Sequence, residues 1–225
     1  MDRVTVAAEA GHVDTLHLAS TGASAAFDHY ERARTGTDES ALGLLTGFDE
    51  FDDLTDGMPR KMVICAARAK MGKTAWAMRV ARNWATIGHR VAFFSLEMDR
   101  DELWARWIAA ESQIPFRAII GRQHMSPEQF RDAFGGKETL AQLPIAVDTK
   151  EALSADDIKL RAMKARRLLG GLDAIVVDHF HCMSHPSAHR GEDGRHAMDR
   201  SSNKLRDLAK SMGVCLLLLA QLNRA

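Results

Sequence analysis

The chain has 225 residues, of which 46% are hydrophobic and 27% are charged, as is typical of one sizeable globular domain. Its 30 basic and 30 acidic residues cancel, which excludes a whole-surface attraction to nucleic acid or membrane. The widely spaced cysteines Cys65, Cys182 and Cys215 indicate buried thiols in a reducing compartment rather than a disulfide framework. The sequence has no long apolar run near its start, so we expect a cytoplasmic protein without membrane contact.

Residues 1–43 are rich in Ala, Gly, Ser, Thr and His and show no strong periodicity, which predicts a flexible amino-terminal arm. Within this arm, residues 24–34 are predicted to form one short helix. From Leu44 onward, apolar runs alternate with amphipathic stretches, so we expect a single domain over residues 44–225.

Short, nearly continuous apolar runs predict the strands of a parallel sheet that is covered on both faces. These runs occupy residues 62–66, 91–96, 143–147, 174–177 and 214–220. Segments with helical periodicity alternate with them, at residues 74–87, 100–112, 154–169 and 196–212. The alternation predicts a doubly wound α/β domain, in which a mostly parallel sheet has helices on both faces.

A phosphate-binding loop is predicted between the first strand and the first helix of this domain. Residues 67–74 follow the G-x-x-x-x-G-K-[ST] spacing, with Ala in the first glycine position. In such a loop the backbone N–H groups and the helix dipole bind a triphosphate, Lys73 adds a positive charge, and Thr74 offers a hydroxyl to Mg²⁺. The predicted nucleotide site on this loop comprises Ala67, Arg68, Ala69, Lys70, Met71, Gly72, Lys73, Thr74 and Ala75.

Two carboxylates at the ends of predicted strands complete the expected site. Asp178 ends an apolar run and fits the acid that holds Mg²⁺ through water, although a strand-end Asp also caps turns. Glu97 follows the run at 91–96, and the carboxyl ends of parallel strands form the ligand crevice of open sheets. We therefore expect Glu97 to polarise the attacking water as a general base, the alternative being a solvated side chain at a helix start.

The segment after Asp178 contains residue types that bind metals, namely His179, His181, Cys182, His185, His189 and His196. We interpret residues 183–195 as a solvated loop rather than a zinc site, because only one cysteine is involved. The basic residues between positions 159 and 167 are interpreted in the same way, as a solvated helix face rather than a DNA contact.

Several stretches resemble the ordered motifs of DnaB-type replicative helicases. They are LLTGFDEFDDLTDGM at 44–58, MVICAARAKMGKT at 62–74, FFSLEM at 93–98, AIVVDHF at 174–180, KLRDLAK at 204–210 and AQLNR at 220–224. The resemblance covers residues 44–225 and keeps the order of the motifs. SLEM together with QLNR distinguishes this family from RadA and KaiC, which share only the phosphate loop.

The resemblance implies the RecA-like ATPase core of a ring-forming hexamer that unwinds duplex DNA by ATP hydrolysis. In that reading Lys73 and Thr74 bind phosphate and Mg²⁺, Glu97 is the catalytic carboxylate and Asp178 is the magnesium-side acid. Gln221 senses the γ-phosphate and relays its presence, since an amide at the end of a central strand can contact phosphate and the next loop. The implied cofactors are ATP and Mg²⁺, and the implied partners are single-stranded DNA and further copies of the chain.

The sequence departs from the family's pattern at three positions. Ala69 and Lys70 replace Pro and Ser in the phosphate loop, and His181 replaces a polar amide after the acid strand. In the family, the last strands, the DNA-tracking loops and an arginine finger follow the motif at 220–224. We therefore expect a core whose C-terminal strands are missing and whose contact with single-stranded DNA is weak or indirect. Two alternatives stay open: a truncated, non-motor nucleotide-binding relative, and a RecA-like ATPase without unwinding activity.

Overall fold

The computed structural model describes residues 18–35, 43–187 and 194–222. The chain divides into two units, residues 1–42 and residues 43–225. In the first unit, helix α1 covers Ala19–Arg34 and begins earlier than the helix predicted at 24–34. The role of residues 1–43 as an arm stays a prediction. None of the helices in the described ranges has the length and hydrophobicity that a membrane span requires.

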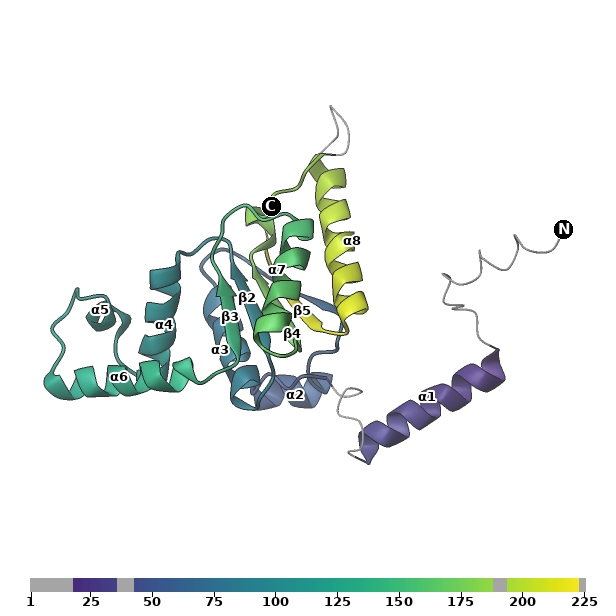
Figure 1. Ribbon diagram of the computed structural model, residues 1–225, viewed down its shortest axis with the longest axis horizontal. Helices are drawn as coiled ribbons and strands as arrows, with labels where there is room; N and C mark the ends of the chain where they lie inside the picture. The colour runs from purple at the N-terminus through teal and green to yellow at the C-terminus, as the bar shows by residue number, and fades with distance from the viewer. Residues whose placement is uncertain (1–17, 36–42, 188–193, 223–225) are drawn as a thin grey trace. The chain divides into compact units, whose positions relative to one another are not determined.

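The second unit is built on a five-stranded sheet in which every pair of neighbouring strands is parallel (Figure 1). The strand order is β1-β5-β4-β2-β3. The strands are β1 Met62–Ala67, β2 Val91–Ser95, β3 Ile145–Asp148, β4 Ala174–Asp178 and β5 Cys215–Gln221. They coincide with the apolar runs of the sequence, which confirms the prediction of a parallel α/β sheet.

The helices predicted from periodicity are confirmed as α3 Lys73–Thr86, α4 Arg100–Ser112, α7 Ala155–Leu168 and α8 Gly194–Met212. The structure adds α2 Asp49–Thr55, α5 Phe116–Ile119, α6 Pro127–Ala141 and the short 3-10 helix η3 Phe180–Cys182, none of which was predicted. Helix α6 begins with a capping box, in which Ser126 and Gln129 each accept a backbone N–H of the other. This signal is local and could have predicted α6 from the sequence.

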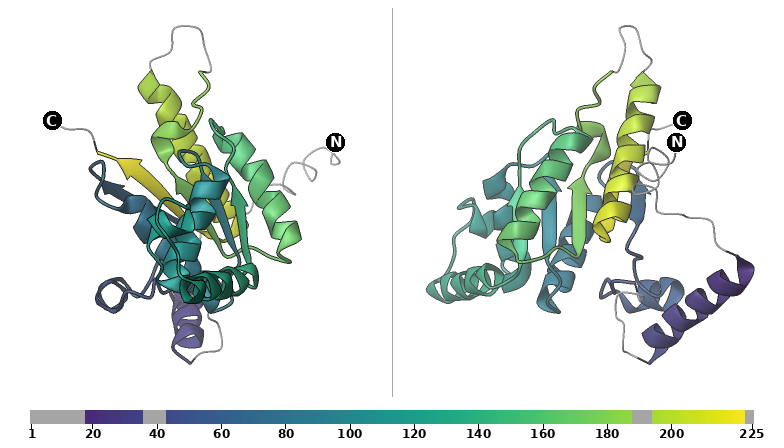
Figure 2. Two further views of the ribbon diagram at one scale, coloured as in Figure 1. Left: turned by 90° about the vertical axis from the view of Figure 1, so that its left-hand side faces the viewer. Right: turned by 45° about the vertical axis from the view of Figure 1, so that its right-hand side comes forward.

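Helices cover both faces of the sheet (Figure 2). Helices α3 and α4 pack on one face, where Phe93 of β2 lies in the same buried cluster as Trp84 and Trp107. Helices α7 and α8 pack on the other face, where the neighbouring Phe94 joins Ile158 and Leu205. Because successive side chains of a strand point to opposite faces, β2 and β4 are apolar and buried along their whole lengths.

The two edges of the sheet differ from the prediction or from the centre. The predicted strand at 143–147 begins only at Ile145, because Pro144 has no N–H for the ladder and contributes its carbonyl oxygen to Val91 N–H at 3.0 Å. At the other edge, β1 pairs with β5 alone within the described part of the chain. Ile64, in the middle of β1, is 53% exposed.

A buried carboxylate joins the amino ends of β2 and β4. Asp173 Oδ2 accepts the backbone N–H of Arg90 at 3.0 Å and its Nε–H at 2.8 Å, and Arg60 Nη1 lies 3.5 Å from Oδ1. Burial alone would raise the pKa of Asp173, but the hydrogen bonds from Arg90 and the charges of Arg90 and Arg60 outweigh it and lower the pKa. The ionised carboxylate therefore stabilises this corner of the sheet.

We expect Asp173→Asn to lower the free energy of unfolding at neutral pH by about 1–3 kcal/mol, because Arg90 loses its charged acceptor. Asp173 has a lowered pKa in the folded state, so its contribution is present above the ordinary carboxyl pKa of about 3.9 and is lost as the pH falls through the lowered value. Urea unfolding at a series of pH values measures both effects.

Glu138→Gln is the matched control, since Glu138 and its ion-pair partner Lys137 are both about half exposed. That variant should change the free energy of unfolding by less than about 0.5 kcal/mol. Equal effects of the two variants at neutral pH would contradict the role given to Asp173.

Candidate functional site

The turn between β1 and α3 presents unused backbone donors at the carboxyl edge of the sheet. Lys70 and Gly72 have left-handed backbone conformations, with φ of 64° and 85°, and Gly72 is the residue before the first turn of α3. In the described part of the chain, the backbone N–H groups from Ala69 to Thr74 donate to no protein acceptor. A turn of this kind at a helix N-terminus attracts an anion through its N–H groups and the helix dipole.

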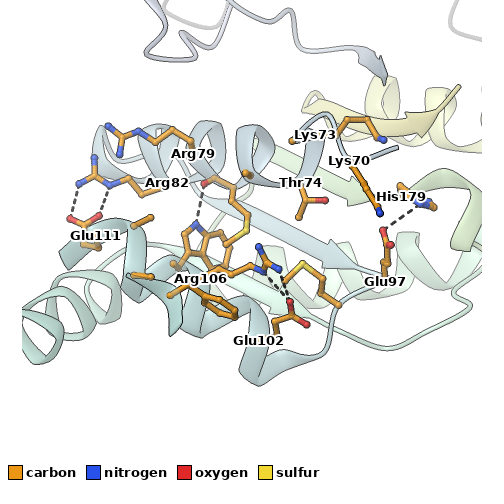
Figure 3. A pocket seen from close by; sticks show the side chains of 18 of the residues that line it. Lys70, Lys73, Thr74, Arg79, Arg82, Glu97, Glu102, Arg106, Glu111 and His179 are labelled. Carbon is orange, nitrogen blue, oxygen red and sulfur yellow. Dashed lines mark hydrogen bonds and ion pairs between the residues drawn. The ribbon is translucent and has the colours of Figure 1, made fainter. Parts of the chain in front are cut away.

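Lysine side chains add positive charge to this turn. Lys73 Nζ donates to the carbonyl oxygens of Ala67 and Arg68 at 3.3 and 3.5 Å, which holds the ammonium over the turn by long contacts. The Lys70 side chain extends from the turn toward Glu97 (Figure 3). The long contacts of Lys73 are weak, so an anion could replace them at little cost.

A cavity of about 880 Å³ runs from the turn along the groove between α3 and α4 (Figure 3). Of the predicted site residues, the cavity is lined by Ala69, Lys70, Gly72, Lys73, Thr74, Ala75, Glu97 and Gln221. Ala67, Arg68, Met71 and Asp178 do not line it: Met71 is 71% exposed at the tip of the turn, whereas Asp178 is fully buried. The cavity therefore brings together most, but not all, of the predicted residues.

Ion pairs that the sequence did not predict fix the walls of this groove. Arg82 of α3 makes a two-pronged contact with Glu111 of α4, at 2.8 and 2.7 Å. Arg106 pairs with Glu102 one turn away on α4, and Trp107 Nε1–H donates to the Met78 carbonyl oxygen at 3.1 Å. The contacts between α3 and α4 hold the two helices that carry the turn and follow Glu97 at a fixed separation.

Asp178, the last residue of β4, is fully buried. Neither of its carboxylate oxygens has a hydrogen-bond partner in the described part of the chain. Burial raises the pKa of Asp178, and the Thr74 hydroxyl, together with the charges of His179 and Lys73, only partly counteracts the rise. A buried carboxylate without a partner is destabilising, and such groups are characteristic of sites where a ligand supplies the partner.

Glu97 lies beside Asp178 because β2 and β4 are neighbours. Ser95 at the end of β2 is paired with Asp178, and the Leu96 N–H donates to the Asp178 carbonyl oxygen at 2.6 Å. The Glu97 side chain is 58% exposed, and its Oε2 lies 3.5 Å from Nε2 of His179. Glu97 is therefore a solvent-accessible carboxylate at the wall of the cavity, close to the turn.

Gln221 reaches the same place from β5, where it is paired with Ala67 at the end of β1. Its backbone N–H donates to Nδ1 of His181 at 3.4 Å. Burial lowers the pKa of His181, as do the charges of His179, His185 and Lys73. This shift favours the neutral imidazole, which has a nitrogen able to accept that N–H.

The histidines after β4 do not form a metal centre within the described residues. No group of three or more His, Cys, Asp or Glu side chains is placed to hold an ion in those ranges. His185 instead stacks on Phe180 at 4.8 Å, while His189 lies outside the described residues. The same is true of residues 188–193 of the predicted loop, and α8 begins at Gly194, earlier than predicted.

The model of the DnaB-like helicase C-terminal domain family matches residues 43–225. The chain belongs to this family. The replicative DNA helicase DnaB of Geobacillus stearothermophilus is 30% identical over 190 residues, which are 84% of this chain and 41% of that protein. The DnaB helicase of Leifsonia xyli subsp. xyli is 31% identical over 190 residues, or 83% of this chain and 40% of that protein. The chain thus spans about two fifths of the length of these relatives.

Solved structures agree with the family assignment. A DnaB-like replicative helicase, studied for its interactions with primase, superposes with a TM-score of 0.74 at 26% identity, covering 81% of this chain and 45% of that chain. A second solved structure, an isolated ATPase domain, superposes with a TM-score of 0.79 at 25% identity, covering 89% of this chain and 71% of that chain. The DnaB-like family and these superpositions confirm the prediction of a RecA-like ATPase fold.

We expect Asp178→Asn to stabilise the ligand-free protein at neutral pH by about 1–3 kcal/mol, because the amide removes a buried charge without a partner. Asp178 has a raised pKa in the folded state, so the wild-type chain loses stability as the pH rises from about 4 through that raised value. The advantage of the variant should therefore grow with pH, as measured by urea unfolding without nucleotide. A variant less stable than wild type throughout this range would contradict the unpartnered state of Asp178.

Proposed function

We propose that this chain forms the ATP-binding and ATP-hydrolysing core of a replicative DNA helicase that unwinds duplex DNA. One observation carries the proposal: Asp178 is buried without a partner, near the Thr74 hydroxyl and beside a turn whose backbone N–H groups are unused. The buried carboxylate lacks a cation and the N–H groups lack an anion. A nucleoside triphosphate with a divalent cation provides both.

In this proposal the triphosphate of ATP lies on the turn formed by residues 67–75, where the free N–H groups bind its oxygens. Lys73 neutralises charge on the β- and γ-phosphates. Thr74 binds Mg²⁺ through its hydroxyl and Asp178 does so through water, which fits the preference of Mg²⁺ for oxygen ligands and retained waters. The bound ion would supply neutralisation of the phosphate charge and would polarise the phosphoryl group.

Glu97 and Gln221 act at the far end of the triphosphate. Glu97 is accessible from the cavity and accepts a proton from the attacking water, the role of a general base. Gln221 lies at the end of β5 and lines the same cavity, so its amide can contact the γ-phosphate. A change at Gln221 then passes along the chain that follows β5, which is how hydrolysis would be coupled to DNA.

The proposed partners are single-stranded DNA and further copies of the chain in a ring hexamer. The printed names of the relatives, replicative DNA helicases, support this assignment and a cytoplasmic site of action. The alternatives are a non-motor nucleotide-binding relative and a RecA-like ATPase that does not unwind DNA. Both have an intact nucleotide site and differ in turnover and its response to DNA.

We expect Lys73→Ala to weaken ATP binding by about 10- to 100-fold, because it removes a charge-assisted contact to phosphate. Fluorescence titration with a labelled ATP analogue measures binding, and steady-state hydrolysis is measured with and without single-stranded DNA. Lys159→Ala, at an exposed position of α7, is the control and should leave both unchanged. DNA-stimulated turnover supports the motor, whereas DNA-independent turnover or binding without turnover supports one of the alternatives. Equal affinity in both variants would contradict the phosphate site.

We expect Glu97→Gln to lower kcat for ATP by about 10²- to 10⁴-fold while ATP affinity stays close to that of the wild-type chain, since only the proton acceptor is lost. Glu102→Gln tests a second carboxylate of the same cavity, paired with Arg106, and should have a much smaller effect. Equal losses in the two variants would show that general charge in the cavity matters and not the base.

A further inference from the structure

His179 lies inside the candidate site, but the proposed function gives it no role. It directly follows Asp178 and is only 8% exposed. Its Nε2 lies 3.5 Å from Glu97 Oε2 and 3.9 Å from the Cys182 sulfur, while its Nδ1 is buried and has no hydrogen-bond partner within the described chain. A buried imidazole with one nitrogen turned to a carboxylate of the cavity wall is a specific arrangement that calls for an explanation.

The chemistry of the two groups settles which one donates. An ionised carboxylate has only lone pairs to offer, so the contact is attractive only when His179 Nε2 carries a hydrogen. In the neutral ring this leaves the lone pair on the buried Nδ1, which agrees with the absence of an acceptor for that nitrogen in the described residues. The 3.5 Å separation is long, as hydrogen bonds of ligand-free catalytic sites often are before the complex forms.

Glu97 depends on this contact for its position. The carboxylate is 58% exposed on a flexible side chain, and within the described residues His179 provides its one hydrogen bond or ion pair. Other charged or ionisable groups near the pair are Lys70 and Lys73 of the turn, Asp178 of β4, and the Cys182 thiol, whose pKa is raised by burial and by the charges of Glu97 and Asp178. The thiol is therefore neutral and does not repel Glu97.

We propose that His179 is a positioning residue for ATP hydrolysis, and that its Nε2–H holds the Glu97 carboxylate in the orientation needed to accept a proton from water. The inference rests on the proposed function of Glu97 as the base. A rigid, buried ring anchored at the end of β4 fixes a mobile carboxylate at the end of β2, and a base displaced by about 1 Å loses on the order of 10²-fold in rate.

The first experiment tests the contact without relying on turnover. In nucleotide-free, ¹⁵N-labelled protein, long-range ¹H–¹⁵N spectra report the ring nitrogens of His179, assigned by their loss in His179→Phe. Glu97→Gln should move the His179 ring resonances and leave those of the exposed His124 in place. Unmoved His179 resonances would overturn the proposal, whether or not the chain hydrolyses ATP.

The second experiment tests the consequence for the reaction. His179→Phe keeps an aromatic ring but removes the donor, and should lower kcat by about 10- to 100-fold while KM for ATP stays within about twofold. His179→Gln places an amide N–H where Nε2–H stands and should restore most of the lost kcat. Thermal unfolding of both variants checks that the buried position still folds.

Each outcome decides between separate claims. A kcat loss in Phe that Gln restores, with the ring shift observed, supports positioning by His179. Equal kcat values for wild type and His179→Phe overturn it, as does an equal loss in the Phe and Gln variants when both fold. Absence of turnover in the wild-type chain counts against the proposed function instead, and the ring shift alone then decides whether His179 holds Glu97.

Discussion

The parallel pairing of β1, β5, β4 and β2 is the constraint on which the rest of the structure depends. Parallel strands bring their carboxyl ends to one edge, and the register sets Ala67 beside Gln221 and Ser95 beside Asp178. A slip of one residue in β4 would turn Asp178 away from Thr74 and would bring Val177 to its place. The register is well specified because β2 and β4 are buried on both faces, so any slip would move large side chains into the wrong layer.

The same edge combines two unfavourable features that compensate each other only when a ligand binds. The turn before α3 leaves backbone N–H groups without acceptors, and β4 ends in a carboxylate without donors. Neither feature would be retained for stability alone, since each unmatched polar group weakens the fold. The Arg82–Glu111 contact between α3 and α4 keeps the groove open beside them, so that the fold presents both features in one preformed cavity.

The sequence predicted the features whose signals are local and missed those that depend on packing. The apolar run ending in Asp178 and the spacing around Lys73 are complete within a few residues. Helix α6 was missed although its cap is local, because two consecutive glycines argue against a helix; a Cβ on Gly136 would lie 3.1 Å from Ser112 Cβ, so glycine lets α6 approach α4 closely. The burial of His179 and its contact with Glu97 join residues of different strands, which no local pattern encodes.

The one-sided pairing of β1 has a consequence for work in solution. Its outer backbone groups form no ladder within the described sheet, and Ile64 stands exposed among them. An open, apolar edge of this kind accepts a strand from any chain that reaches it, including another copy. Concentrated samples of this chain are thus prone to strand-to-strand aggregation, and particle size alone would not distinguish such aggregates from an ordered ring.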